Sequence, residues 1–388
     1  MQNICDKDKC TGCGFCAAKC PKSAISVEIV GLHYFPVVNQ EKCIDCGLCK
    51  KQCPSNNPIQ LNSIQSCFAA WSNDEHDYFE SASGGIATAI SKKFIQNGGY
   101  VVGCTWNKNF RATSVVTNKI EDLEKFRKSK YVHNYFSKET YHEILSLLKS
   151  GKRVLFIGVP CQCEAIKKFV GPHGTNLLTI NLLCRGAASP KLFKDYIAKF
   201  KKENKNIGDI TFRGGKFDCN FCVWDNHENL LYKCGQYEDP YFYSFMRHTM
   251  YRKSCLTCFY AQDKRPGDLT IADFWGLDNK IIEQYNLKRG VNLVLLHTDK
   301  GKELRSMITN ETTFIERPVQ EAIAGNDTLK EPTSKPFQYD LLNKMYPILG
   351  LEKSLYIFDF GFKRNKLKYF IRSLVPDFIV KIIKRCLK

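Results

Sequence analysis

Two runs of cysteines near the N-terminus share one spacing, C-x2-C-x2-C-x3-C, and each run is followed by proline. A run of this kind ligates [4Fe–4S] clusters, and where two runs occur the fourth cysteine of each binds the other cluster. The spacing therefore predicts two clusters. The first would be held by Cys10, Cys13, Cys16 and Cys53, and the second by Cys43, Cys46, Cys49 and Cys20.

Zinc is the alternative metal, because C-x2-C pairs also occur in zinc ribbons. Two identical runs of four cysteines favour iron–sulfur clusters over zinc. Gly12, Gly14 and Gly47 let the backbone wrap closely around a cluster and direct amides at its sulfurs. Residues 24–38 alternate apolar and polar side chains, which is typical of a β-hairpin. Residues 1–60 are thus expected to form a ferredoxin-type domain that carries single electrons.

The composition describes an intracellular globular protein. The chain has 388 residues, of which 44% are hydrophobic and 25% are charged, so it has room for more than one domain. Its 20 cysteines have metal-site spacing rather than the pattern of a small disulfide scaffold, and no leader or spanning segment is visible. A cytoplasmic location is expected. The net charge of +18 suggests an acidic redox partner, a phosphorylated cofactor or an anionic membrane surface, while no nucleic-acid module is visible.

After a linker rich in proline, asparagine and serine, segments with strand and helix patterns alternate, which predicts an α/β layer with a largely parallel sheet. This second domain is assigned to residues 65–340. Strands are expected at 100–106, 153–160 and 177–186, and helices at 81–99, 138–151, 163–171 and 189–204.

Four more cysteines could form a third cluster in this domain. Cys161 follows one predicted strand and Cys184 ends the next, and the carboxyl ends of parallel strands meet at one edge of a sheet. A further C-x2-C pair, Cys255 and Cys258, lies later in the chain. The four thiolates together would suit a third [4Fe–4S] cluster.

Several motifs occur in the order of one known family. They are "SGG" at 83–85, "KSKYV" at 128–132, "GVPCQ" at 158–162, "CRG" at 184–186, "FRGGK" at 212–216, "CLTCFYA" at 255–261 and "GDLTIADFWG" at 267–276. The chain resembles the family of coenzyme F420 hydrogenase/dehydrogenase beta subunits, in its form with an N-terminal 2[4Fe–4S] ferredoxin domain. The resemblance implies a non-Rossmann α/β domain that holds FAD, with a [4Fe–4S] cluster on the third cysteine set. It also implies hydride transfer between F420 and FAD, followed by electron flow along the clusters.

The flavin contacts are expected at three places. A Ser/Gly turn before a helix offers free amides and a positive dipole to a pyrophosphate, although the same turn could simply cap the helix. Two lysines could add positive charge or form a solvated surface run. The strand end before the third cysteine set would approach the flavin ring. These residues are Ser83, Gly84 and Gly85, then Lys128 and Lys130, then Gly158, Val159 and Pro160. His133 and Asp273 are candidates for proton transfer, but the sequence does not choose between them.

The remaining cysteines have weaker patterns. Cys163 is interpreted as a buried thiol, and Cys5 fits neither run. Cys219, Cys222 and Cys234 lie in an alternating hairpin, where they could be part of a metal site or small residues of the pleat.

The C-terminal segment, residues 350–388, combines apolar and basic residues with few acids. As a helical tail broken near Pro376, it would be amphipathic and basic, which suits peripheral association with a membrane surface. The alternative is a helix docked on the body of the protein.

The sequence as a whole predicts an iron–sulfur flavoprotein oxidoreductase. It would pass electrons from a hydride carrier, F420 or a nicotinamide, through FAD and [4Fe–4S] clusters to a protein partner. A non-catalytic ferredoxin-type protein that docks on an enzyme is the alternative. A third reading, a redox sensor, would use a disulfide between Cys161 and Cys163.

Overall fold

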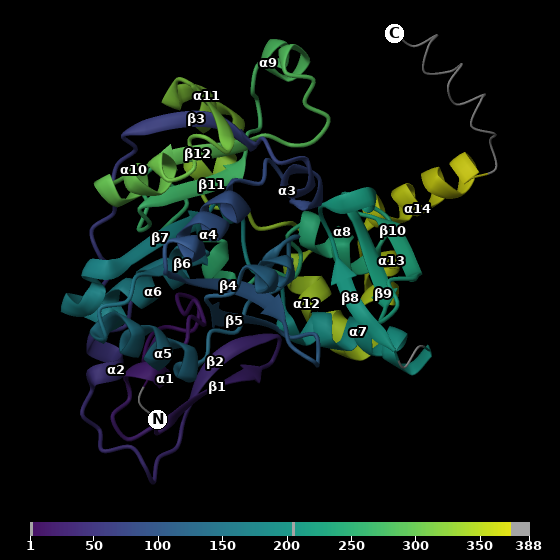
Figure 1. Ribbon diagram of the computed structural model, residues 1–388. Helices are drawn as coiled ribbons and strands as arrows, with labels where there is room; N and C mark the ends of the chain where they lie inside the picture. The colour runs from purple at the N-terminus through teal and green to yellow at the C-terminus, as the bar shows by residue number, and fades with distance from the viewer. Residues whose placement is uncertain (1–2, 204–205, 374–388) are drawn as a thin grey trace.

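The computed structural model describes residues 3–203 and 206–373. Within them the strands form a two-stranded, a three-stranded and an eight-stranded sheet (Figure 1). The N-terminal unit holds the predicted hairpin, which turns at Gly31 and pairs its two strands in antiparallel register. Its two short helices each begin directly after a left-handed glycine, Gly14 and Gly47. These elements are β1 (Ile25–Val30), β2 (His33–Val38), α1 (Phe15–Lys19) and α2 (Leu48–Lys51).

The eight-stranded sheet is mixed rather than largely parallel. Its strand order is β13-β3-β12-β11-β7-β6-β4-β5, and its parallel neighbours are the pairs β4–β6, β6–β7 and β7–β11. The alternating β and α pattern predicted this parallel centre correctly. The antiparallel flanks come from strands that the sequence pattern did not separate from loops. The bounds are β3 (Ser66–Ser72), β4 (Tyr100–Trp106), β5 (Ala112–Thr117), β6 (Val154–Gly158), β7 (Leu177–Leu182), β11 (Leu269–Asp273), β12 (Asn292–Leu296) and β13 (Thr312–Glu316).

Helices cover both faces of this sheet because neighbouring strand residues point to opposite sides. Leu155 of β6 packs in the core under α4 and α10, whereas Phe156 packs in the core under α5 and α6. The helices around the sheet are α3 (Glu75–Glu80), α4 (Ile86–Gln96), α5 (Lys138–Lys149), α6 (Pro160–Val170), α9 (Asn279–Gln284), α10 (Asp299–Ser306) and α11 (Val319–Gly325).

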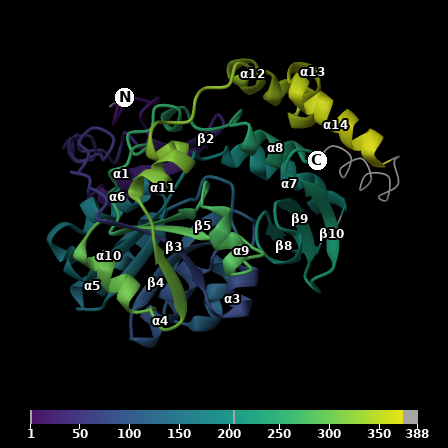
Figure 2. The same cartoon turned by 90° about the horizontal axis from the view of Figure 1, so that it is seen from above.

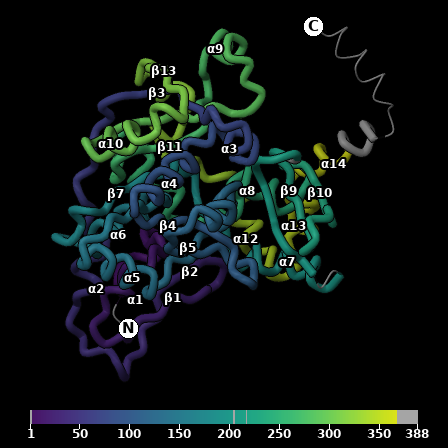
Figure 3. The backbone as a smooth tube through the Cα atoms, viewed as in Figure 1, coloured from purple at the N-terminus to yellow at the C-terminus, as the bar shows by residue number. Residues whose placement is uncertain are grey.

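The N-terminal unit docks on the α5–α6 side of the sheet (Figure 3). Phe15 of α1 belongs to the same core as α5 and meets Phe169 of α6 edge to face at 6.4 Å. The Tyr141 hydroxyl donates to the carbonyl of Cys13 at 3.0 Å. A Cβ on Gly14 would lie 2.4 Å from the carbonyl oxygen of Phe136, so only glycine permits this close approach.

The segment between the N-terminal unit and the sheet is held along its length. The Ile59 amide donates to Glu164 at 2.9 Å, and the Tyr260 hydroxyl donates to the other oxygen of that buried carboxylate. Asn62 then forms an antiparallel bridge with Arg265.

A smaller aromatic subdomain lies beside the main sheet (Figure 2). Ser189 caps α7, accepting from the Leu192 amide at 3.0 Å, as expected from the Ser-Pro pair that precedes the helix. Phe212, Phe221 and Tyr241 are fully buried in its core. The elements are α7 (Pro190–Glu203), β8 (Ile207–Thr211), β9 (Asn220–Asp225), β10 (Leu230–Gly235) and α8 (Pro240–Met246).

Three helices close the described chain beside this subdomain. Phe362 of α14 is buried against Tyr243 with ring centroids 5.0 Å apart, so the start of α14 docks on the body. Phe360, at the first position of the same helix, is 78% exposed. None of the helices within residues 3–203 and 206–373 has the length and apolar character needed to cross a membrane. The expected break at Pro376 lies outside the described residues. The helices are α12 (Tyr339–Leu349), α13 (Leu351–Phe358) and α14 (Phe360–Ser373).

Candidate iron–sulfur and cofactor sites

The first predicted cysteine set lines one cavity. Burial, together with the neighbouring thiols of Cys53 and Cys10, raises the pKa of Cys13 to about 12. Cys5 lies in the same cavity and hydrogen-bonds to two of the four thiols. The wall contains all four expected ligands: Cys10, Cys13, Cys16 and Cys53. The donors therefore come from both runs, as the crossed pairing requires.

The second set lines an adjacent cavity nearer the surface. Burial raises the pKa of Cys49, and Cys20 and Cys46 raise it further. The Ala24 amide donates to the Cys20 sulfur at 3.3 Å, which is the backbone-to-sulfur contact that stabilises a cluster thiolate. The cavity is lined by Cys20, Cys43, Cys46 and Cys49.

The third set gathers at the carboxyl edge of the parallel strands. Cys161 lies in the first turn of α6, which begins at Pro160 and not, as expected, at Cys163. Burial raises the pKa of Cys161 well above its usual range, and Cys184, Cys258 and Cys255 each raise it further. The Ala187 amide donates to the Cys255 sulfur at 3.4 Å.

All three sets suit iron–sulfur clusters by their donor chemistry. Each set consists of thiols alone, and the buried thiols of the third set, which raise the pKa of Cys161, ionise together only when cations compensate them. Iron in a cluster supplies that compensation. Among residues 3–203 and 206–373, no three His, Cys, Asp or Glu side chains are grouped closely enough to hold a single metal ion.

The first and third sets are neighbours. Cys13 contributes to the raised pKa of Cys161. The buried Tyr141 hydroxyl lies near both sets. Burial is the main cause of its raised pKa, and Cys13, Cys16 and Cys161 also raise it. The structure thus places the third set against the first, and the second set beyond it near the surface.

The predicted phosphate contacts fit an anionic cofactor only in part. Ser83 is buried and its hydroxyl oxygen has no partner, so it remains available to a ligand. Gly84 instead lies tightly against the sheet, because an added Cβ would be 2.5 Å from the carbonyl oxygen of Ala70. The next helical amide, that of Ile86, already donates to Asn292 at 3.1 Å.

The two predicted lysines have partners within the protein. Lys128 pairs with Glu80 at 3.4 Å. The Lys130 ammonium is buried and donates to the carbonyls of Lys125 and Arg127 at 2.9 and 2.8 Å. Burial lowers the pKa of Lys130. Lys128 therefore ties its loop to α3 and Lys130 stabilises the loop itself, and neither is directed to a ligand by these contacts.

Two arginines beside Ser83 were not found from the sequence. Arg213 donates to Asp273 at 3.1 Å and to the carbonyl of Ala82 at 2.5 Å. Arg289 donates to the carbonyls of Phe79 and Gly215, and its Nε has no partner. Both guanidinium groups border the loop that carries Ser83. The "FRGGK" motif was a signal for the first, whereas no local pattern marks the second.

Gly158, Val159 and Pro160 lead directly into the third cysteine set. Val159 is extended and precedes α6, and Pro160 occupies the first helical position. A Cβ on Gly158 would lie 2.6 Å from the Phe156 ring. This segment forms part of the same edge as Cys161.

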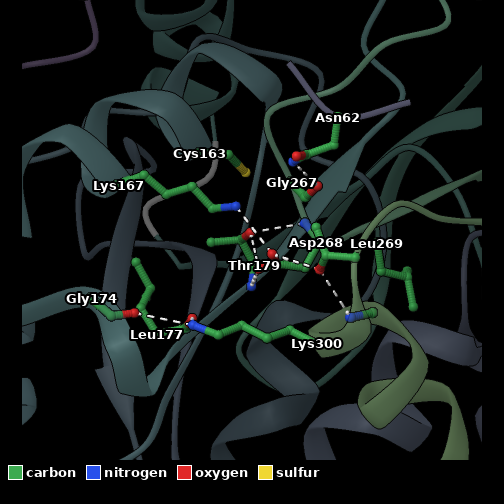
Figure 4. Close-up of polar contacts among 12 residues, drawn as sticks. Asn62, Cys163, Lys167, Gly174, Leu177, Thr179, Gly267, Asp268, Leu269 and Lys300 are labelled. Atoms are coloured by element: carbon green, nitrogen blue, oxygen red, sulfur yellow. Dashed lines mark hydrogen bonds and ion pairs between the residues drawn. The ribbon is translucent and has the colours of Figure 1, made fainter. Parts of the chain in front are cut away.

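The "GDLTIADFWG" motif has a structural role at its start (Figure 4). Asp268 accepts from the amide and hydroxyl of Thr179 at 2.8 and 2.6 Å, from Thr298 at 3.0 Å, and from Lys167 at 3.2 Å. This buried network joins β7 and α6 to the residue that precedes β11. At the end of the motif, Trp275 is 63% exposed.

His133, one of the two candidates for proton transfer, is buried near Arg252, and burial lowers its pKa well below the usual range.

The other cysteines do not assemble with these sets. Cys163 is fully buried, with its sulfur 3.7 Å from the carbonyl of Gly158. Since it lies two residues after Cys161 on one helix, the two side chains do not share a face, which disfavours the redox-sensor reading. In the β9–β10 hairpin, Cys234 pairs with Phe221 and Cys222 pairs with Lys233, so these cysteines point to opposite faces.

Two families match the chain. Residues 151–321 match the C terminus of the coenzyme F420 hydrogenase/dehydrogenase beta subunit, and residues 9–57 match the 4Fe–4S dicluster domain. The F subunit of F(420)H(2) dehydrogenase from Methanosarcina mazei is 27% identical over 233 residues, which cover 56% of this chain. The alignment spans 65% of that relative's length. A chain of the F420-reducing [NiFe] hydrogenase complex from Methanosarcina barkeri aligns with a TM-score of 0.47 and 18% identity, over 76% of this chain and 92% of that chain.

Proposed function

The chain belongs to the family of coenzyme F420 hydrogenase/dehydrogenase beta subunits, in the form with an N-terminal 4Fe–4S dicluster domain, and we propose that it is an iron–sulfur flavoprotein oxidoreductase. Two electrons enter together from a hydride carrier, coenzyme F420 or a nicotinamide, at an FAD site in residues 65–340. They leave singly through three [4Fe–4S] clusters to a protein partner. A bound flavin supplies the exchange between two-electron and one-electron steps.

The observation that carries this proposal is the position of the third cysteine set. Cys161 and Cys184 lie at the carboxyl edge of the parallel strands, where α/β proteins bind ligands. The same set neighbours Cys13 of the first set. Electrons released at this edge therefore have a short path into the N-terminal unit.

The protein's side chains have distinct roles in the proposal. The twelve thiols hold the clusters, and Ser83 and Arg289, whose hydroxyl and Nε have no partner, bind the cofactor phosphates. Gly158 and the two residues after it bring the backbone of the sheet edge to the third cluster. No acid–base residue is assigned.

The test is anaerobic reduction of the full chain by F420, NADH or NADPH in turn, followed at the flavin absorption and by EPR of the clusters. We expect a flavin band and reduction by one carrier. In Cys255→Ser the flavin should still be reduced, while electrons reach the N-terminal clusters much more slowly. A purified protein with two clusters and no flavin would instead identify the non-catalytic electron-transfer alternative.

A further inference from the structure

Two arginines beside the third cysteine set are the largest charged side chains that the fold removes from water. Arg252 and Arg265 are each 1% exposed. Arg252 immediately precedes the turn that presents Cys255, and the amide of Cys255 donates to the Arg252 carbonyl at 2.9 Å. Arg265 follows Cys258 and pairs with Asn62 through the backbone.

Neither guanidinium has a carboxylate partner among residues 3–203 and 206–373. Arg252 donates to the carbonyls of Cys10 and Tyr34, and its plane lies over the Phe35 ring at 4.1 Å. Arg265 donates to the carbonyls of Tyr260 and Thr328 at 2.6 and 2.9 Å. Nη2 of Arg252 and Nε of Arg265 have no hydrogen-bond partner.

A third arginine shows how this protein otherwise buries such a charge. Arg127 is also buried, far from the cysteine sets in the sequence, and its guanidinium pairs with the buried carboxylate of Asp77 and with Glu124. Leaving a buried cation without a counter-charge is costly. In the part of the chain that the structure describes, Arg252 and Arg265 lack such a carboxylate, so another anion must balance their charge.

Iron–sulfur clusters with thiolate ligands carry negative charge, and the first and third cysteine sets lie next to these two arginines. Arg252 contacts both sets through the backbone, because its guanidinium donates to the carbonyl of Cys10 and its own carbonyl accepts from the amide of Cys255. Arg265 lies beside the third set, because its guanidinium donates to the carbonyl of Tyr260, two residues after Cys258. The histidines packed near Arg252, His33 and His133, carry no negative charge.

We propose that Arg252 and Arg265 are the counter-ions of the iron–sulfur clusters, with Arg252 shared between the first and third clusters and Arg265 dedicated to the third. This inference rests on the proposed third cluster. A reduced cluster carries one more negative charge than an oxidised one, so a buried guanidinium favours reduction. The shared arginine raises the potentials of two neighbouring clusters together, which keeps electron exchange between them close to balance.

The test is an EPR-monitored redox titration of the full chain with all clusters assembled, using Cys255→Ser to identify the third signal. Arg252→Gln should make reduction of both the first and third clusters about tenfold less favourable, which is 59 mV for a one-electron couple. Arg265→Gln should shift only the third cluster. The lysine variants, Arg252→Lys and Arg265→Lys, should retain most of each potential because they keep the charge.

Lys253→Gln is the matched control, since Lys253 is adjacent in sequence but 60% exposed and paired with Asp8. It should leave all potentials unchanged. Unchanged potentials in the glutamine variants, or equal shifts in the glutamine and lysine variants, would overturn the inference. Where a glutamine variant fails to assemble a cluster, assembly in the lysine variant supports a charge role, and failure in both refutes it.

The two proposals fail in different ways. A wild-type protein with only two clusters would remove the third cluster and the role of Arg265. The effect of Arg252→Gln on the first cluster would still decide whether that arginine is its counter-ion.

Discussion

Cys13 of the N-terminal unit and Cys161 of α6 are electrostatic neighbours, although 147 positions separate them in the numbering of the chain. The contact of α1 with α5 and α6 brings them together. The two predicted clusters that these cysteines serve are therefore adjacent, and this adjacency has a magnetic consequence.

In the fully reduced protein, the EPR signals of the first and third clusters should be broadened by spin–spin interaction. Cys161→Ser should remove this broadening, because it removes a ligand of the third cluster. Cys163→Ser, a change at a buried thiol outside the set, should leave it intact. A wild-type spectrum equal to the sum of isolated clusters would contradict the adjacency.

Iron content gives a direct count of the third cluster. Cys255→Ser should lower the anaerobically measured iron by about four atoms per chain. Cys222→Ser is the control, since Cys222 is a buried pleat residue on the opposite face from Cys234. Equal iron in wild type and Cys255→Ser would show that Cys255 is no ligand.

These cysteine assignments mark what could be predicted from the sequence. The two N-terminal sets follow from spacing alone, and the parallel centre of the sheet follows from the alternation of strand and helix patterns. The mixed α/β fold and the ferredoxin-type unit agree with these expectations, while the non-Rossmann flavin domain stays a prediction.

Strand order at the edge of the sheet and the burial of individual side chains depend on long-range contacts, so they could not be predicted from the sequence. The flanks β3, β12 and β13 pair across more than 200 positions, and no local pattern encodes their order. Lys130 looked suited to phosphate, yet its ammonium binds carbonyls of its own loop. Arg252 lies in no sequence motif that marks it, and only the folded chain shows it buried against Cys10.

Gly84→Ala should destabilise the protein by about 1 to 3 kcal/mol, because the new Cβ would meet the Ala70 carbonyl oxygen at 2.5 Å and the Asn292 amide at 2.9 Å. Chemical denaturation measures the change. At Gly174 an added Cβ meets only a methyl of Val170 at 3.1 Å, so Gly174→Ala should cost clearly less. Equal costs would mean that the loop before α4 is not pressed against the sheet as described.

Asp268→Ala should cost about 3 kcal/mol of unfolding free energy, because it leaves Lys167 without its partner and Thr179 without its acceptor. The exposed pair of Asp299 and Lys302 on α10 offers a comparison. Asp299→Ala should have little effect, since water screens an exposed pair. A small loss in Asp268→Ala would show that this buried network does not stabilise the sheet.

Asp239 should give a pH-dependent contribution to stability. Burial raises its pKa to about 6, against the opposing hydrogen bond from Tyr196. Because the folded state favours the protonated acid, the contribution is fully present below the unfolded pKa of about 3.9 and is lost as the pH rises through 6.

Asp239→Asn keeps a neutral side chain at every pH. Relative to wild type, this variant should gain stability between pH 5 and pH 8, by on the order of 1 to 3 kcal/mol. Denaturation of both proteins at several pH values measures the difference. A difference that does not vary with pH would show that Asp239 is ionised in the fold throughout this range.

The hydrogen bonds of Ile59 and the bridge of Asn62 fasten the connecting segment to the body of the protein. The N-terminal unit is therefore held in one position relative to the sheet and does not move as a separate domain toward a distant electron acceptor. In the proposed electron transfer, an acceptor protein has to bind at the second cysteine set, where Cys46 is exposed.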